Sequence, residues 1–221
     1  MKIIALTDIH GKPHAADAIA ADLAAADLVL LPGDLTHFGK RDAAMQVVDA
    51  VRRHNPNILA VMGNCDHPEV EQFLAEGNIC VHRGHREIGG VVFAGLGGSL
   101  PGPFKTLNEW SEEQITDHLD AAISGAPRGK PLVLMSHQPP HNTVTDRIKS
   151  GLHVGSTAVR AFIERRAPMV CFSGHIHEAQ GTDRIGDTTL VNPGPFMDGR
   201  YAWAEIENGQ CRVEIRRASE P

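Results

Sequence analysis

Short apolar runs alternate with segments of helical spacing along this 221-residue chain, and that alternation restricts the possible folds more than any other feature. The runs are rich in Val, Ile, Leu or Met and too short for long helices, which is typical of buried strands. Residues 14–27, 41–54 and 156–166 have the spacing of amphipathic helices, and Ser156 or Thr157 suits the N-cap of the last one. Strands that alternate with helices predict βαβ units and a mostly parallel sheet. The runs cover residues 2–7, 28–32, 57–62, 91–95, 131–136, 169–173, 188–191, 201–206 and 211–216.

The last part of the chain has a different pattern. Residues 201–206 and 211–216 alternate in polarity on either side of the turn sequence ENGQ, which predicts an antiparallel hairpin with one exposed face. Residues 97–110 are dense in Gly and Pro and precede a helix capped at Ser111, and loops of this kind are commonly functional or mobile. Because the sequence has no repeat, low-complexity tract or linker, we expect a single α/β domain over residues 1–221, built as a layered sandwich.

The overall composition excludes several classes of protein. A formal net charge of −6 argues against a general affinity for nucleic acid or anionic membranes, because both require clustered Lys and Arg. Asp8 and His10 interrupt the N-terminal apolar run, and no apolar run reaches the roughly 18 residues of a membrane span. The four cysteines form no CxxC pair, which argues against a disulfide framework or a zinc ribbon. We therefore expect a cytoplasmic protein.

Five of the apolar runs end in polar side chains that can bind metals. In open α/β sheets, ligands bind beside the carboxyl ends of the strands, so side chains that are distant in sequence would converge there. Two carboxylates, one amide and four imidazoles are too many ligands for one tetrahedral zinc ion and suit two cations that share a carboxylate. Glycine precedes three of these side chains, as tight turns after a strand require. The seven residues are Asp8, His10, Asp34, Asn64, His137, His175 and His177.

Each motif taken alone has an ordinary structural explanation. An Asp-x-His sequence occurs by chance, Gly-Asp after an apolar run is a common turn, and His-x-His can be two solvated imidazoles. The sequence MGNCDH at 62–67 fits a metal site, a reactive cysteine or a simple turn. The five motifs occur in order, however, and each follows an apolar run. Their joint occurrence indicates one shared site.

Together the five motifs resemble the signature of calcineurin-like metallophosphoesterases. Three longer segments, 95–114, 136–156 and 174–181, further resemble a small prokaryotic branch of predicted phosphoesterases related to cyclic-nucleotide hydrolases. The resemblance implies a four-layer α/β/β/α sandwich in which residues 97–110 form a loop near the site. The motifs are D-I-H at 8–10, G-D at 33–34, G-N-C-D at 63–66, S-H at 136–137 and G-H-I-H at 174–177, and they span nearly the whole chain.

The same resemblance implies two divalent metal ions and a division of the ligands between them. The first ion would take Asp8, His10 and His177, and Asp34 would bridge the two ions. The second ion would take Asn64, His137 and His175. Phosphodiester hydrolysis would then proceed by attack of a metal-bridging hydroxide. Mixed nitrogen and oxygen ligation suits Mn, Fe, Co, Ni or Zn better than Ca or Mg. The sequence leaves the metal open within that group, and manganese is the ion we choose for assays.

Cys65 is the main departure from the family pattern. Many phosphatases of the family have histidine at this position, where it helps to protonate the leaving oxygen. A thiol beside two cations should shift toward thiolate, which is a poor proton donor. We place Asn64 and Cys65 at the catalytic position and expect activity on phosphodiesters with good leaving groups rather than on alkyl monoesters. A small residue that fills a turn explains Cys65 equally well, and Asp66 should stabilise that turn or an imidazole.

Three residues outside the motifs are candidates for contact with the substrate. His141 and His153 follow the 131–136 strand and could face the substrate or replace the missing acid; we assign His153 to catalysis and His141 to substrate binding. Phe104, in the 97–110 loop, could stack on a base or an aryl group, or anchor the loop in the core. Six other histidines have no such context and are expected on the surface or in packing: His14, His37, His54, His82, His85 and His118.

The leading hypothesis is a dimetal phosphodiesterase that acts on a small phosphorylated substrate. The first alternative is a metal-poor scaffold similar to retromer-type interaction proteins of this fold, although all seven ligand positions are filled. A nuclease is the second alternative, and the acidic composition argues against it. We expect no membrane partner, and the sequence leaves open whether the chain forms a homo-oligomer.

Overall fold

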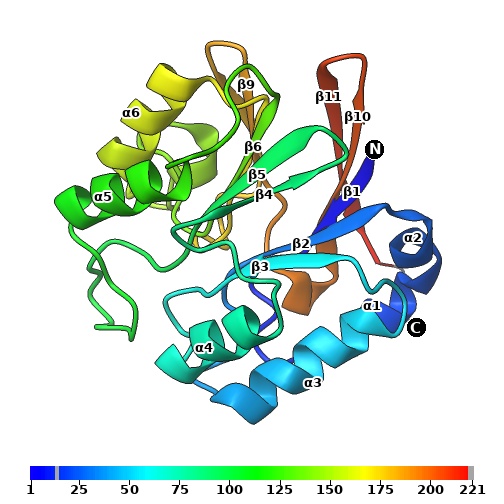
Figure 1. Ribbon diagram of the computed structural model, residues 1–221. Helices are drawn as coiled ribbons and strands as arrows, with labels where there is room; N and C mark the ends of the chain where they lie inside the picture. The colour runs from blue at the N-terminus through cyan, green and yellow to red at the C-terminus, as the bar shows by residue number, and fades with distance from the viewer. Residues whose placement is uncertain (13–14, 219–221) are drawn as a thin grey trace.

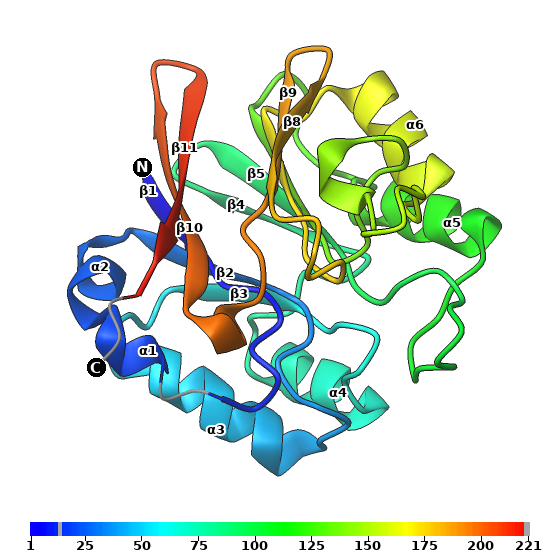
Figure 2. The ribbon, with the colours of Figure 1, turned by 180° about the vertical axis from the view of Figure 1, so that it is seen from behind.

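The computed structural model describes residues 1–12 and 15–218, and these residues form two sheets that lie between two groups of helices (Figures 1 and 2). The first sheet has the order β11-β10-β1-β2-β3, and the second has the order β4-β5-β6-β7-β9-β8. The strands of the first sheet are β1 Lys2–Ala5, β2 Leu28–Pro32, β3 Ile58–Val61, β10 Arg200–Glu207 and β11 Gln210–Arg217. Those of the second are β4 His85–Ile88, β5 Val91–Leu96, β6 Leu132–Ser136, β7 Val170–Phe172, β8 Gly181–Ile185 and β9 Thr188–Asn192.

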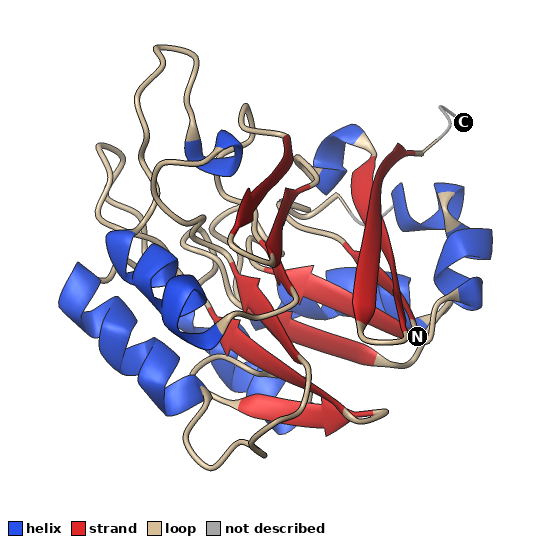
Figure 3. Cartoon of the chain, turned by 90° about the horizontal axis from the view of Figure 1, so that it is seen from above, coloured by secondary structure: helices blue, strands red, loops and turns tan. Residues whose placement is uncertain are grey.

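Helices cover the outer face of each sheet, and Figure 3 shows the strands between the two groups of helices. On the first sheet lie α1 Ala15–Ala18, α2 Ala20–Ala25, α3 Arg41–Arg52 and α4 Pro68–Glu76. On the second lie α5 Glu112–Ala122 and α6 Thr157–Arg166. Two short 3₁₀ helices, η1 Val144–Asp146 and η2 Phe196–Asp198, lie in loops. The architecture is therefore the expected four-layer α/β/β/α sandwich.

Three separate apolar cores fill the spaces between the four layers. Successive side chains of a strand point to opposite faces of the sheet, so each central strand contributes to two cores. In β1, Ile4 packs under the helices of the first sheet, whereas Ile3 packs between the two sheets. The outer core of the second sheet joins Leu134 of β6 to Phe162 of α6. Burial on both faces explains why these strands are continuous apolar runs.

Two elements differ from the sequence-based prediction. The helix expected over 14–27 is two short helices, α1 and α2, and residue 14 lies outside the described residues. The edge strands β4 and β8 were not predicted, because their sequences HREI and GTDRI lie half-exposed and contain no apolar run. Edge strands commonly carry charges of this kind.

The parallel and antiparallel parts of the sheets match the sequence pattern. Strands β1, β2 and β3 are parallel, as are β5, β6, β7 and β9. The C-terminal hairpin is antiparallel, and its turn residues Asn208 and Gly209 have φ values of 51° and 75°, as a type I′ turn requires. The predicted N-cap of α6 is Ser156, whose hydroxyl accepts a hydrogen bond from the Val159 amide at 3.1 Å. No helix in the described part of the chain is both long and apolar enough to cross a membrane.

Candidate metal centre

The structure brings the predicted ligand side chains to one place, beyond the carboxyl ends of strands from both sheets. Asp8 and His10 follow β1, Asp34 follows β2, and Asn64 follows β3 in the first sheet. His137 follows β6, and His175 and His177 follow β7 in the second sheet. Neither sheet alone could supply the full set, so the packing of one sheet on the other creates the centre.

The first group consists of Asp8, His10 and His177. Nε2 of His177 lies 3.2 Å from Oδ1 of Asp8 and 3.2 Å from Nε2 of His10, and His10 Nε2 lies 4.0 Å from the same carboxylate oxygen. Nitrogen and oxygen ligands about 2.1 Å from one metal ion lie roughly 3 to 4 Å from each other. The three side chains therefore converge at the spacing that a single cation requires.

The second group is built around His137. Its Nε2 lies 2.9 Å from Oδ1 of Asn64 and 3.5 Å from Oδ2 of Asp34. Its Nδ1 lies 2.9 Å from the carbonyl oxygen of Pro32, to which it donates, so Nε2 is the nitrogen that faces the centre. A histidine that binds metal through one nitrogen commonly donates from the other to such an oxygen.

Asp34 lies between the two groups. Its Oδ2 is 3.7 Å from Nε2 of His10 in the first group and 3.5 Å from Nε2 of His137 in the second. Its Oδ1 accepts a hydrogen bond from the amide of Cys65 at 2.8 Å, which fixes the orientation of the carboxylate. A carboxylate in this position can contact two cations at once.

His175 lies less close to the others than expected for the second group. The ring centroids of His175 and His137 are 5.3 Å apart. Among the described residues, three groups of His, Cys, Asp or Glu have their possible ligand atoms within 4.8 Å of one another, and His175 belongs to none of them. Its backbone amide instead donates to both carboxylate oxygens of Asp8, at 3.2 and 3.1 Å. The three groups are Asp8–His10–His177, Asp8–Asp34–His137 and His10–Asp34–Cys65.

Burial and neighbouring groups shift the pKa values of the Asp34, His137 and His175 side chains. Burial alone would raise the pKa of Asp34, but the neighbouring His137 outweighs this effect and holds that pKa well below its usual range. Burial would lower the pKa of His137, but Asp34 raises it to about 9. For His175, burial and then His137 lower the pKa to about 4. The metal-free centre therefore holds an ionised Asp34, a protonated His137 and a neutral His175, so metal binding at His137 would release its Nε2 proton.

The backbone at the centre adopts conformations that side-chain-bearing residues rarely take. Asp8, His10, Asp34 and His175 have φ values of 54°, 49°, 50° and 65°, in the left-handed region. Such strain persists only where the surrounding structure imposes it, and it is concentrated at functional sites. Four of the seven predicted ligands share this feature.

The glycines before the ligands are required mainly by close approach. A Cβ atom on Gly63 would lie 2.0 Å from Oδ1 of Asp34, and one on Gly174 would lie 2.4 Å from Oδ2 of Asp8. Gly33 combines a φ of +95° with a Cβ position 2.4 Å from Nδ1 of His137. The sequence-based explanation, permissive backbone angles, therefore applies to Gly33, whereas Gly63 and Gly174 are needed because they lack a side chain.

Asp66 stabilises the turn rather than an imidazole. Its carboxylate accepts hydrogen bonds from the amides of Gly63, Leu35 and Thr36 at 2.8, 3.1 and 2.8 Å, and from the Thr36 hydroxyl at 2.7 Å. It thereby ties the loop after β2 to the loop after β3. This connection holds Asp34 and Asn64 next to each other.

Cys65 lies within the centre, where its Sγ forms a cluster with ligand atoms of His10 and Asp34. Burial, followed by the charge of Asp34, raises the pKa of the Cys65 thiol well above its usual value. The thiol is therefore protonated in the metal-free protein. The shift toward thiolate that the sequence suggested would have to come from bound cations.

The 97–110 loop packs directly against the centre. The amides of Leu107 and Asn108 donate to the carbonyl oxygen of Asn64 at 3.0 and 3.3 Å. The Asn108 side chain donates to the carbonyl oxygens of Gly63 and Asp66 at 2.8 and 2.7 Å. Asn108, which the sequence analysis did not single out, thus fastens this loop to the GNCD turn.

Phe104 and Trp110 occupy opposite environments in that loop. Trp110 anchors its end by donating from Nε1 to the Gly97 carbonyl oxygen at 3.0 Å and by packing with His82 and His118. Phe104 is 87% exposed and therefore does not anchor the loop in the core. The explanation of Phe104 as a core anchor is therefore wrong, and stacking on a base or an aryl group stays a prediction.

His141 and His153 lie next to each other in the segment that follows β6. Their ring centroids are 6.1 Å apart. His153 donates from Nδ1 to Oδ1 of Asp146 at 2.7 Å, and the side chain of Asp146 is completely buried. That carboxylate also accepts hydrogen bonds from the amides of Asn142, Thr143 and Gly155 and from the Thr143 hydroxyl. Sequence reasoning missed Asp146, although the spacing Thr143-x-x-Asp146 is a capping-box pattern that could have indicated it.

Hydrogen bonds of three side chains hold this segment beside the predicted ligands. The side chain of Gln138, directly after His137, donates to the carbonyl oxygen of Val154 at 3.1 Å and accepts from the Leu100 amide at 2.9 Å. The side-chain amide of Asn192 donates to the carbonyl oxygens of Ile176 and Thr145, at 2.9 and 3.5 Å. Glu178, next to His177, accepts from the Lys149 amide at 2.8 Å. The loops that carry Phe104 and His153 are thus joined to each other and to the centre.

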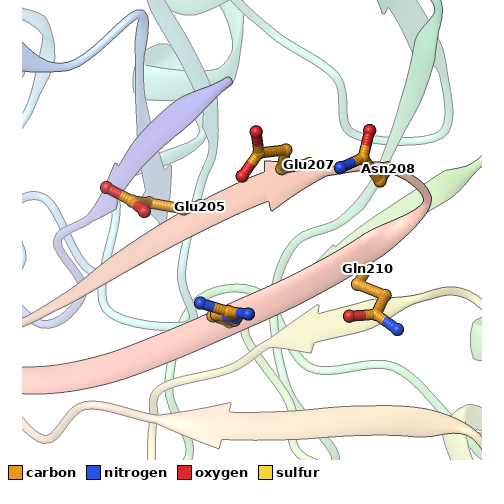
Figure 4. Close-up of a pocket in the computed structure, with 5 residues that line it drawn as sticks. Glu205, Glu207, Asn208 and Gln210 are labelled. Carbon is orange, nitrogen blue, oxygen red and sulfur yellow. The ribbon is translucent and has the colours of Figure 1, made fainter.

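A surface hollow on the β10–β11 hairpin lies away from this site. It is lined by Glu205, Glu207, Asn208, Gln210 and Arg212, four of which are labelled in Figure 4. Lys2 at the start of β1 pairs with Glu205, whereas Asp8 follows the other end of β1. The hollow therefore lies at the opposite end of the strand from the predicted ligands.

Comparison with known proteins agrees with the geometry. A family model described as calcineurin-like phosphoesterase matches residues 1–179. The protein MJ1162 of Methanocaldococcus jannaschii is 37% identical over 201 residues, which cover 88% of each chain. The structure of TT1561 from Thermus thermophilus matches with a TM-score of 0.78 at 19% identity and covers 99% of both chains. A dimetal phosphatase from Danio rerio matches with a TM-score of 0.64 at 14% identity, over 100% of this chain and 97% of that one. These two structures share the fold, and the family match over most of the sequence identifies the chain as a member of the calcineurin-like phosphoesterase family.

Proposed function

We propose that this protein is a dinuclear metal-dependent phosphodiesterase that acts on a small molecule or a nucleotide. The observation that carries the proposal is the position of Asp34, whose Oδ2 lies within 3.7 Å of one histidine of each ligand group. Asp8, His10 and His177 would hold one cation, and Asn64, His137 and His175 the other. The cations would supply Lewis acidity to the phosphoryl group and lower the pKa of a bound water.

The contribution of the protein is to hold the ligand side chains in position. The Cys65 amide orients Asp34, and the Pro32 carbonyl orients His137, so both side chains are held before any ligand binds. Such preorganisation avoids the cost of ordering the site during the reaction. Because Asn64 belongs both to the ligand set and to the turn held by Asn108, substrate binding to the 97–110 loop and metal binding would be linked.

His153 is our candidate for the proton donor to the leaving oxygen. The Asp146 carboxylate holds Nδ1–H, so that Nε2 is the nitrogen available to a substrate. The same hydrogen bond fixes the orientation of the ring, as a general acid requires. In this assignment Cys65 contributes shape rather than acid catalysis.

Phe104 and His141 would contact the group attached to phosphate. An exposed aromatic ring in a loop fastened to Asn64 suits stacking on a base or an aryl group. This arrangement favours a diester with a flat substituent over a simple alkyl monoester.

The deciding experiment combines metal analysis with a substrate panel. Protein purified without chelator should contain about two divalent ions per chain, as in other two-metal sites, and manganese should support activity. The manganese-loaded protein would be assayed on aryl and nucleotide diesters, cyclic 2′,3′- and 3′,5′-nucleotides, and monoesters.

Asp34→Asn should lose bound metal and activity together, whereas Asp187→Asn, which changes an exposed carboxylate, should lose neither. A wild-type protein that binds no metal would instead support the scaffold alternative. Hydrolysis of monoesters alone would refute the diesterase assignment.

A further inference from the structure

The C-terminal strand β11 is an edge of the first sheet, and no other strand in residues 1–12 and 15–218 pairs with its outer side. The sheet order places it at the end, with β10 as its neighbour on the inner side. The opposite edge, β3, is covered at Ala60, whose amide and carbonyl bond to Ile79 and Val81. Figures 1 and 2 show the tip of the β10–β11 hairpin projecting beyond β1. Uncovered edges of this length are usually blocked or used for pairing.

The hairpin geometry determines which backbone groups of β11 point outward. In a hairpin with a two-residue turn, the residues that flank the turn form a hydrogen-bonded pair, and such pairs recur at every second position. Glu207 and Gln210 flank the turn, so the backbone groups of Gln210, Arg212, Glu214 and Arg216 bond to β10. The amides and carbonyls of the alternate residues face away from the sheet: Cys211, Val213 and Ile215.

The side chains of these alternate residues are apolar and half-buried. Cys211, Val213 and Ile215 pack at the margin of the core between the two sheets. On the other face of the strand, Arg212 and Glu214 are exposed. The strand thus presents open backbone groups, a margin of apolar surface and charges of alternating sign.

We propose that two copies of this chain associate through antiparallel pairing of their β11 strands about a two-fold axis at Val213. In that register Val213 lies opposite itself, and Cys211 lies opposite the partner's Ile215. Arg212 lies opposite the partner's Glu214, and the reverse pair follows by symmetry. Opposite charges directly across a strand pair are stabilising, and the apolar margins of both copies are covered.

The neighbouring registers are disfavoured by the same side chains. An axis at Glu214 would place Glu214 opposite itself and Arg212 opposite Arg216, and an axis at Arg212 would place Arg212 opposite itself. Like charges in these positions repel each other. A shift by one residue would place apolar side chains opposite polar ones on each face. The sequence of β11 therefore favours the axis at Val213 over the axes at its two neighbours.

The metal centre is not part of this interface. Strand β10 lies between β11 and β1, and Asp8 follows the end of β1 far from the hairpin turn. Pairing would join the first sheets of two molecules into one continuous sheet while both centres stay open. The inference is therefore independent of the proposed function.

The first test is the mass of the protein in solution as a function of concentration, by light scattering and sedimentation equilibrium. The wild type should approach twice the monomer mass at high concentration. Val213→Pro removes an outward amide that β10 does not use, so it should leave the monomer folded and abolish dimerisation. A wild type that stays monomeric throughout, or a Val213→Pro variant that still dimerises, would overturn the proposal.

The second test determines the register by oxidative cross-linking in a Cys211→Ser background. Residues of a hydrogen-bonded antiparallel pair have Cα atoms about 5.5 Å apart, within reach of a disulfide. Val213→Cys should therefore cross-link to its copy, whereas Arg212→Cys and Glu214→Cys should not. Efficient cross-linking at 212 or 214 instead would refute the register.

Charge reversal supplies a third, reversible test. Arg212→Glu should weaken dimerisation by roughly tenfold or more, because two attractive pairs become repulsive. The double variant Arg212→Glu with Glu214→Arg should restore it. Thermal unfolding of each monomer controls for two effects within one chain: Arg212 lies opposite Glu205, and Glu214 accepts hydrogen bonds from Arg216. No recovery in the double variant would contradict the pairing.

Discussion

A Cβ atom on Gly63 would lie 2.0 Å from Oδ1 of Asp34, so the turn after β3 touches the carboxylate that follows β2 with no room for a side chain. The same carboxylate accepts the Cys65 amide, two residues further along that turn. The position of Asp34 between the two ligand groups therefore depends on Gly63, which has no side chain that could bind a metal.

Gly63→Ala should displace Asp34 and lower the metal content of the protein. The clash involves the carboxylate and its own backbone amide, at 2.2 Å, so neither can move freely. We expect a loss of metal and a loss of stability on the order of 1–3 kcal/mol. Metal analysis and chemical unfolding would measure both. Gly84→Ala is the matched control, because a Cβ there meets only atoms at 3.9 Å. Full metal content in Gly63→Ala would disprove the role of the close contact.

Cys65→His should restore hydrolysis of alkyl monoesters relative to diesters. An imidazole at this position would add a proton donor that the thiol, with its raised pKa, does not provide. Cys65→Ala should leave diester hydrolysis largely intact, because the residue then fills space without an acid role. The measurement is kcat/KM of both variants on matched diester and monoester substrates. Unchanged monoester hydrolysis in Cys65→His would show that the missing acid does not set the preference.

His153→Gln should reduce turnover of substrates with poor leaving groups by about 10²-fold or more, the usual contribution of a general acid. Substrates with aryl leaving groups should change little, because their leaving oxygen needs no proton. Asp146→Asn should act in the same direction with a smaller effect, since it weakens the hydrogen bond that orients the His153 ring. A series of diesters with leaving groups of different pKa provides the measurement.

Asp183→Asn is the control for a merely structural effect in this segment. Asp183 accepts the Val144 amide at 2.8 Å and makes no hydrogen bond to His153. If the Asp146 and Asp183 variants lose activity equally across the whole leaving-group series, the proposed role of His153 as the acid is wrong.

The stability of the metal-free protein should decrease as the pH is lowered, because of His82. Burial, followed by the nearby Arg83 and His118, lowers the pKa of His82 from 6.5 to about 3. Its Nδ1 accepts the Gly97 amide at 2.8 Å, so the folded protein holds the ring neutral. Below pH 6.5 the unfolded chain binds a proton that the folded chain does not, and stability falls by at most about 1.4 kcal/mol per pH unit down to about pH 3.

His82→Asn keeps an acceptor for the Gly97 amide and should flatten this dependence. Urea unfolding at several pH values between 7.5 and 4.5, in the presence of chelator, would measure it for wild type and variant. His37→Asn, which removes an exposed imidazole, is the control and should leave the slope unchanged. An equal slope in wild type and His82→Asn would exclude His82 as the source.

The candidate site could be predicted from the sequence because each ligand directly follows a buried strand. Asp34, Asn64 and His137 follow apolar runs, and the carboxyl ends of parallel strands meet along one edge of a sheet. The glycine before each turn was also visible, although the sequence did not show that Gly63 is required by contact with Asp34 rather than by its backbone angle.

The edge strands and the supporting contacts could not be predicted in the same way. Strands β4 and β8 bury little surface, so no apolar pattern indicates them. The partner of His153 is Asp146, and the residue that joins the 97–110 loop to the centre is Asn108; both act through hydrogen bonds to groups that sequence spacing does not identify.

The layered α/β fold and the residue types at the strand ends could be predicted from the chain alone, because burial on both faces of a parallel sheet leaves a recognisable pattern of apolar residues. Three properties became visible only in the folded protein: the ends of the two sheets face each other, Asp34 lies between two ligand groups, and Phe104 is exposed while Trp110 is packed. These properties depend on how one layer packs on another, and that packing joins side chains whose separation along the chain carries no information about their distance in space.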